Sequence, residues 1–134
     1  MKRKVIVVVA VLLLAFIWAH SIIPKQTSTY ESQYFTNAVL NPLLSHFGLD
    51  AVDKDVVRKI AHVFEFLILS FFTSLYWDGM AVKNIYIGLT VASLDESIQV
   101  VTGRGALITD IWIDLIGVGI GTVIGYIVCK LKGK

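Results

Sequence analysis

The chain has 134 residues, of which 56% are hydrophobic. Only 16% are charged, whereas an average soluble domain carries about 25% charged residues. The formal net charge of +2 is too small to indicate nucleic acid as a partner, and the one cysteine cannot form an internal disulfide bond. These values favour an integral membrane protein that forms a single domain over residues 1–134.

Four segments are apolar and close to the roughly 20 residues that a membrane-spanning helix needs. They cover residues 5–23, 58–78, 84–102 and 110–130. The first segment follows a basic start and ends near a loose small-residue motif, so a cleaved signal peptide is the alternative to an anchored span. The sequence therefore predicts an all-α fold, a four-transmembrane-helix antiparallel bundle.

Residues 24–57 separate the first two predicted spans and have an amphipathic pattern. Pro42 interrupts this pattern, so we expect one or two short helices on the outer membrane surface. Gly48 is expected to end the last of them, and Asp53 or Asp55 to cap the next span. The apolar residues near helical spacing are Phe35, Val39, Leu43 and Phe47.

Basic residues gather at both ends of the chain and in the connection after the second span. An even number of spans places both termini on one side, and the positive-inside rule predicts that this side is the cytoplasm. The chain is therefore expected to be a multi-pass protein of the cell membrane with both termini cytoplasmic. The basic residues are Lys2, Arg3, Lys4, Lys83, Lys130, Lys132 and Lys134.

The later spans carry polar side chains at similar depth below their outer ends, counting ~1.5 Å per helical residue. Each ionisable side chain that faces lipid at mid-membrane costs ~2.5–3.5 kcal/mol, so we expect them to face one another around a polar pocket open to the outside. The carboxylates outnumber the bases, which implies protonated acids, a bound cation or water. These residues are Arg58, Lys59, His62 and Glu65, then Asp95, Glu96 and Gln99, then Arg104 in the following turn, and Asp110 and Asp114.

An imidazole beside carboxylates is typical of acid–base sites. The candidate catalytic residues are His62, Glu65, Asp95 and Glu96. The candidate ligand-binding residues are Arg58, Lys59, Gln99, Arg104, Asp110 and Asp114. The alternative for the whole set is a structural hydrogen-bonded network. Because the set has one histidine, the signal for a metal is weak and no cofactor is identified. The other histidines, His20 and His46, are interpreted as incidental surface residues.

Three glycines, Gly117, Gly121 and Gly125, recur every four residues in the last span. Small residues at this spacing let two helices approach closely. We expect them to support packing within one chain, with dimerisation as the alternative.

The runs RKIAHVFEF (58–66) and DESIQVVTGRGALITDIWIDLIGVGIG (95–121) resemble the VanZ-like family over residues 58–125. The chain departs from the family pattern at Phe66, where Tyr is common, and at Thr102, where Pro is common. The resemblance implies a bacterial membrane protein of the cell envelope. It also implies a role in lowering susceptibility to teicoplanin-type glycopeptide antibiotics.

Three functions stay open, and each has membrane lipid as a partner. The first is a non-enzymatic protein that binds a lipid-linked cell-wall precursor or a glycopeptide through Arg58, Lys59 and Arg104. The second is a membrane-embedded hydrolase or transferase acting on a lipid-linked phosphate or wall precursor, with His62 as general acid or base. The third is an assembly partner for another membrane protein.

Overall fold

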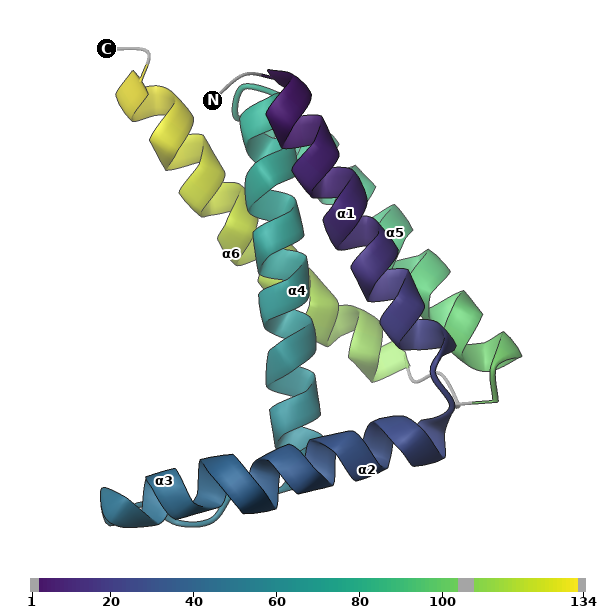
Figure 1. Ribbon diagram of the computed structural model, residues 1–134. Helices are drawn as coiled ribbons and strands as arrows, with labels where there is room; N and C mark the ends of the chain where they lie inside the picture. The colour runs from purple at the N-terminus through teal and green to yellow at the C-terminus, as the bar shows by residue number, and fades with distance from the viewer. Residues whose placement is uncertain (1–2, 104–107, 133–134) are drawn as a thin grey trace.

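The computed structural model describes residues 3–103 and 108–132, and these residues contain helices but no strand. Four long helices within them pack side by side, and each runs opposite to the one before (Figure 1). The predicted all-α fold is confirmed, with helix ends that differ by a few residues. The long helices are α1 (Arg3–Ile22), α4 (Lys54–Tyr76), α5 (Ala81–Val101) and α6 (Ile108–Lys132).

Two of the described helices, α1 and α6, are long and apolar enough to cross a membrane. Helices α4 and α5 have comparable lengths of 23 and 21 residues but carry more polar side chains. Many of these polar side chains are buried against other helices, as Ser70, Asn84 and Asp95 are. Composition alone therefore supports two candidate spans in the described part of the chain, and the count of four remains a prediction.

A rod of α2 (Lys25–Phe35), the π-helical turn η1 (Thr36–Leu40) and α3 (Asn41–His46) lies across one end of the bundle (Figure 1). The expected one or two short helices are present as α2 and α3, and Pro42 lies in the first turn of α3, where the backbone stays helical. Proline cannot donate a backbone hydrogen bond and crowds the carbonyl four residues earlier. The wider η1 turn relieves this crowding, and Asn41 N–H donates to the Thr36 carbonyl five residues back.

The predicted caps beside this rod are present. Gly48 follows α3 with a φ of 69°, and its N–H donates to the Ser45 carbonyl at 3.1 Å. Leu49 N–H donates to the Leu44 carbonyl at 3.0 Å, which completes a Schellman motif. At the start of α4, the Asp53 side chain accepts a hydrogen bond from the backbone N–H two residues later at 2.8 Å.

Helices α4 and α6 cross in close contact through the glycines of α6. A Cβ added at Gly117 would overlap the main chain of Val63, and one added at Gly121 would overlap that of Leu67. The expectation that these glycines serve packing within one chain is confirmed. The apolar core around this crossing comprises Ile17, Phe66, Leu69, Val91, Ala92 and Val118.

A second set of buried contacts is polar and uncharged. Asn84 is fully buried in α5, and its Nδ2 lies 2.8 Å from both Ser70 Oγ and Thr122 Oγ1. Its Oδ1 accepts a hydrogen bond from Thr73 Oγ1 at 2.6 Å. We call Asn84, Ser70, Thr73 and Thr122 the neutral network, and it links α4, α5 and α6 in the half of the bundle near the termini.

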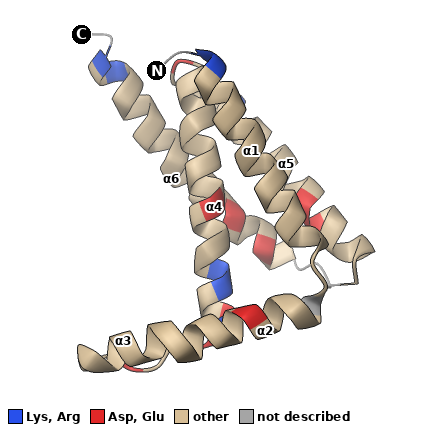
Figure 2. Ribbon diagram, in the orientation of Figure 1, with Lys and Arg blue, Asp and Glu red and all other residues tan. Residues whose placement is uncertain are grey.

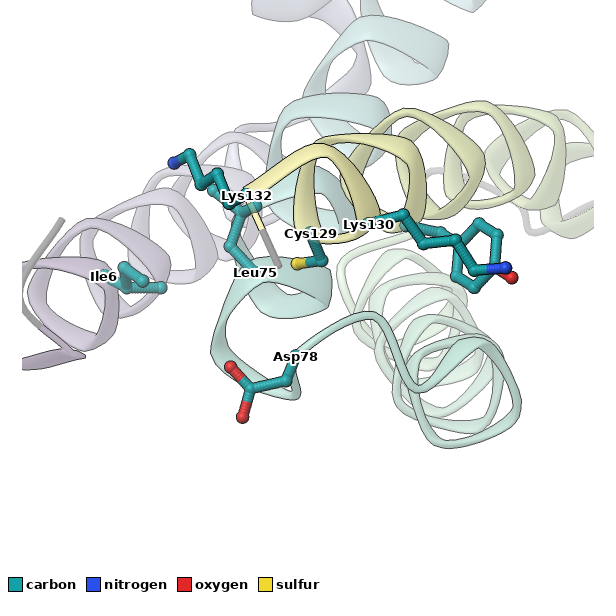
Figure 3. Close-up of a pocket in the computed structure, with 7 residues that line it drawn as sticks. Ile6, Leu75, Asp78, Cys129, Lys130 and Lys132 are labelled. Carbon is teal, nitrogen blue, oxygen red and sulfur yellow. The ribbon is translucent and has the colours of Figure 1, made fainter. Parts of the chain in front are cut away.

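The end of the bundle that carries both termini has a groove of about 540 Å³ (Figure 3). Arg3 and Asp78 form an ion pair at 2.6 Å there, which joins the start of α1 to the turn after α4. Among the residues that the structure describes, its lining includes none of the candidate site residues. Its lining residues are Ile6, Leu75, Asp78, Tyr126, Cys129, Lys130 and Lys132.

Candidate functional site

Acidic residues of α4, α5 and α6 come near a common level partway along the bundle (Figure 2), whereas Asp55 lies at the start of α4. Three side chains from these helices meet there, because His62, Asp95 and Asp114 each offer one ligand atom and these atoms all lie within 4.8 Å of one another. The residues are far apart in the sequence, and the antiparallel packing brings them together. The prediction that the polar residues of these helices face one another is confirmed for this set.

Asp95 is held by hydrogen bonds on both of its oxygens. The side chain is fully buried, and Oδ1 accepts a hydrogen bond from Ser21 Oγ on α1. Oδ2 accepts one from Gln99 Nε2 at 2.8 Å, one helical turn further along α5. The expected common face of Asp95 and Gln99 is therefore present, and the Asp95 carboxylate has a fixed orientation.

Asp114 is almost as deeply buried, with 1% of the residue exposed. Its Oδ1 lies 3.7 Å from His62 Nδ1, which is too long for a hydrogen bond but close enough for an ion pair when the imidazole is protonated. Its Oδ2 has no hydrogen-bond partner among residues 3–103 and 108–132. Asp114 is therefore a buried carboxylate with capacity for a further partner.

His20, which was expected to be incidental, lies in the site, so that interpretation is wrong. Its Nδ1 lies 3.3 Å from Glu65 Oε1, and its ring is parallel to that of His62 with centroids 6.5 Å apart. Ile17 lies one turn earlier on the same face of α1 and is buried in the bundle core, so the face that carries His20 points into the bundle. We call His20, His62, Glu65, Asp95 and Asp114 the ionisable group.

Sequence reasoning missed His20 and Ser21 because the first predicted span is apolar on nearly every face. His20 and Ser21 lie three and four residues after Ile17, which places all three on one helical face. The sequence did not show that Ile17 is buried in the bundle, so it did not show that this face points inward. The other predicted incidental histidine, His46, is exposed on α3.

The remaining predicted residues lie around the group in different ways. Glu96 is buried beside Asp95 in the sequence, and Asp110 is half-buried near Thr109. Arg58 is half-buried and Lys59 is exposed, and in the described part of the chain no ion pair joins either cation to a carboxylate. Arg104 lies outside the described residues.

The side chains of the ionisable group differ in how much of their surface is exposed. The side chain of His20 is 31% exposed, that of His62 is 17% exposed, and that of Asp114 is only 2% exposed. The group is therefore closed at its carboxylate end and reachable at its histidine end. An imidazole beside fixed carboxylates can transfer protons, and the same nitrogen and oxygen atoms can hold a cation.

A family model described as VanZ/LLP1 matches residues 6–130. The match includes every member of the ionisable group and reaches from α1 almost to the end of α6. Neither the comparison with curated proteins nor that with solved structures found a match. Because the family model covers nearly the whole chain, the protein belongs to the VanZ/LLP1 family.

Proposed function

We propose that this VanZ-like protein crosses the bacterial cytoplasmic membrane four times, with α2–α3 on the outer surface. Apolar side chains on α4 support this proposal, because Ile60, Phe64 and Ile68 are 50%, 56% and 40% exposed and recur every four residues. On α5, Val82 and Tyr86 are each 68% exposed. Such stripes are costly in water and suit lipid contact, while Ser70 and Ser74 of α4 and Asn84 and Asp95 of α5 are buried inside the bundle.

The termini and the turn between α4 and α5 lie at one end of the bundle (Figure 1). The positive-inside rule supports a cytoplasmic location for this end. Its described basic residues are Arg3, Lys4, Lys83, Lys130 and Lys132. Alkaline phosphatase fused after residue 50 should be active outside the cytoplasm, and the same enzyme fused after residue 79 should be inactive. Activity at residue 79 and none at residue 50 would overturn the orientation.

We further propose that the ionisable group is the active site of a membrane-embedded hydrolase or transferase of the cell envelope. The observation that carries this proposal is the meeting of His62, Asp95 and Asp114 within 4.8 Å. Burying charged groups is costly and seldom needed for stability alone. The same bundle already links these helices through the uncharged network of Asn84. A charged set therefore indicates chemistry rather than assembly.

The proposed substrate is a lipid-linked phosphate or wall precursor, which reaches the site by diffusion within the outer leaflet. His62 would act as general acid or base, and the contact between His20 and Glu65 would fix the open side of the site. Arg58, Lys59 and Arg104 are the candidate phosphate contacts. A change in wall-precursor supply is the route by which glycopeptide susceptibility would change.

A deletion strain tests this function through its lipid-linked wall intermediates and its teicoplanin susceptibility. Wild-type protein and the exposed-residue control His46→Ala should restore both, whereas His62→Ala at equal protein level should restore neither. Full restoration by His62→Ala would contradict an enzymatic role for the group. If the protein only binds an anion, His62→Ala should largely retain function while Arg104→Ala loses it.

A further inference from the structure

We propose that His62, Asp95 and Asp114 bind a divalent first-row metal cation, Zn²⁺ or Mn²⁺, between α4, α5 and α6. The inference deepens the proposed function and rests on it, because the cation would occupy the same group of side chains. One imidazole nitrogen and two carboxylate oxygens form a ligand set of this kind. Such ligands suit borderline and hard divalent cations better than soft ones such as Cu(I).

The three ligand atoms are slightly farther apart than the ligand atoms around a bound metal ion. The three atoms lie within 4.8 Å of one another, and His62 Nδ1 is already 3.7 Å from Asp114 Oδ1. Ligand atoms about 2.0–2.2 Å from a tetrahedral Zn²⁺ lie roughly 3–3.5 Å apart. Side-chain rotation of His62 and Asp114 toward the fixed Asp95 carboxylate would shorten the separations toward these values.

Asp114 provides an independent indication of a ligand. The residue is 1% exposed and its carboxylate is directed at the imidazole of His62, yet Oδ2 has no hydrogen-bond partner within the described residues. Buried polar atoms are nearly always satisfied, so an orphaned carboxylate oxygen needs an explanation. A cation held by this oxygen supplies one.

Asp95 is arranged as an oriented ligand. Its two oxygens each accept one hydrogen bond, from Ser21 and from Gln99, and each keeps a lone pair for a cation. Outer hydrogen bonds of this kind fix the direction of a metal-ligating carboxylate. They explain why Ser21, on an otherwise apolar stretch of α1, is buried against this site.

The charge of the surroundings also favours a cation. Glu65 adds a third carboxylate to those of Asp95 and Asp114. Among residues 3–103 and 108–132, no Lys or Arg forms an ion pair with any of these three residues. A divalent cation would offset this excess of negative charge, and a three-residue ligand set leaves a position for water or for a phosphate oxygen.

Metal binding by untagged full-length protein in detergent micelles tests the inference. Protein stripped with chelator should take up about one equivalent of Zn²⁺ or Mn²⁺ in equilibrium dialysis followed by elemental analysis. Asp114→Asn should weaken binding by at least about tenfold, and Ser21→Ala by about tenfold, since outer-shell changes typically cost 10–100-fold in affinity. The control Asp50→Asn, in an exposed loop, should bind like the wild type.

The outcomes separate this inference from the proposed function. Circular dichroism of each variant confirms its fold, and Ser21→Ala keeps the test valid if Asp114→Asn does not fold. If the wild-type protein binds neither metal, or binds it no better than Asp114→Asn, the metal site is wrong. If metal binds as expected but His62→Ala complements the deletion fully, the site stands and the enzymatic function falls.

Discussion

The bundle holds two buried polar sets that differ in kind. In the neutral network, Asn84 contacts Ser70, Thr73 and Thr122 at hydrogen-bonding distance, and these side chains carry no charge. In the ionisable group, Asp114 Oδ2 and Glu65 Oε2 have no hydrogen-bond partner among the described residues. Burial of polar side chains is therefore not by itself evidence of function. A satisfied neutral set stabilises, whereas an ionisable set with spare acceptors is arranged for a ligand.

The two sets are also packed differently. Near the neutral network, α4 and α6 are in main-chain contact through Gly121, and a Cβ at Gly125 would lie against Ser74. Such close contact restricts the rotation of both helices about their axes, and this rotation determines where His62 and Asp114 point.

The largest loss of stability is expected where the crossing is tightest. Gly121→Leu places a side chain into the main chain of Leu67 and should lower the free energy of unfolding by at least about 3 kcal/mol, at the upper end of overpacking effects. Thermal unfolding in detergent and protein level in membranes measure this. Gly119→Leu is the matched control, because a Cβ at Gly119 meets nothing within 4 Å. Equal losses in both variants would refute the packing role of Gly121.

A smaller loss is expected in the neutral network. Asn84→Ala removes the shared partner of Ser70, Thr73 and Thr122 and should destabilise the protein by about 1–3 kcal/mol. The control is Thr90→Ala on the same helix, whose exposed hydroxyl donates only to the carbonyl of Tyr86. Denaturant titration gives the difference. Folded Asn84→Ala should complement the deletion strain like the wild type, and loss of function in the folded variant would place the network in the site.

Ser21→Ala should affect both stability and function, because Ser21 donates a hydrogen bond to the buried site residue Asp95. Loss of one hydrogen bond to Asp95 should cost about 0.5–1.5 kcal/mol and should lower complementation several-fold, since Asp95 loses its orientation. Ser97→Ala is the control, because its exposed hydroxyl donates only to the Ser93 carbonyl on its own helix. Wild-type function in Ser21→Ala would show that Asp95 needs no positioning from α1.

Much of the fold could be predicted from the sequence, because the patterns that specify it are local. Apolar length predicted the long helices, Asp53 and Gly48 marked helix ends, and the glycine spacing predicted close packing. The π-helical turn that joins α2 to α3 before Pro42 could not be predicted, because no residue type marks such a turn in the sequence.

The candidate site was only partly predictable for a related reason. His62, Asp95 and Asp114 stand out because charge is rare in an apolar helix, so their meeting could be inferred from cost alone. His20 and Ser21 could not be assigned, since the rotation of α1 about its axis depends on packing and not on its own pattern.

Asp114→Asn is the sharpest test of whether the ionisable group serves function at the expense of stability. The free energy of unfolding is measured in chelator, and complementation of the deletion strain is measured in parallel. Stability should stay within about 1 kcal/mol of the wild type, because an amide of the same size replaces a carboxyl group buried near other carboxyl groups, and complementation should be lost. A variant that is destabilised like Asn84→Ala and still complements fully would contradict the account.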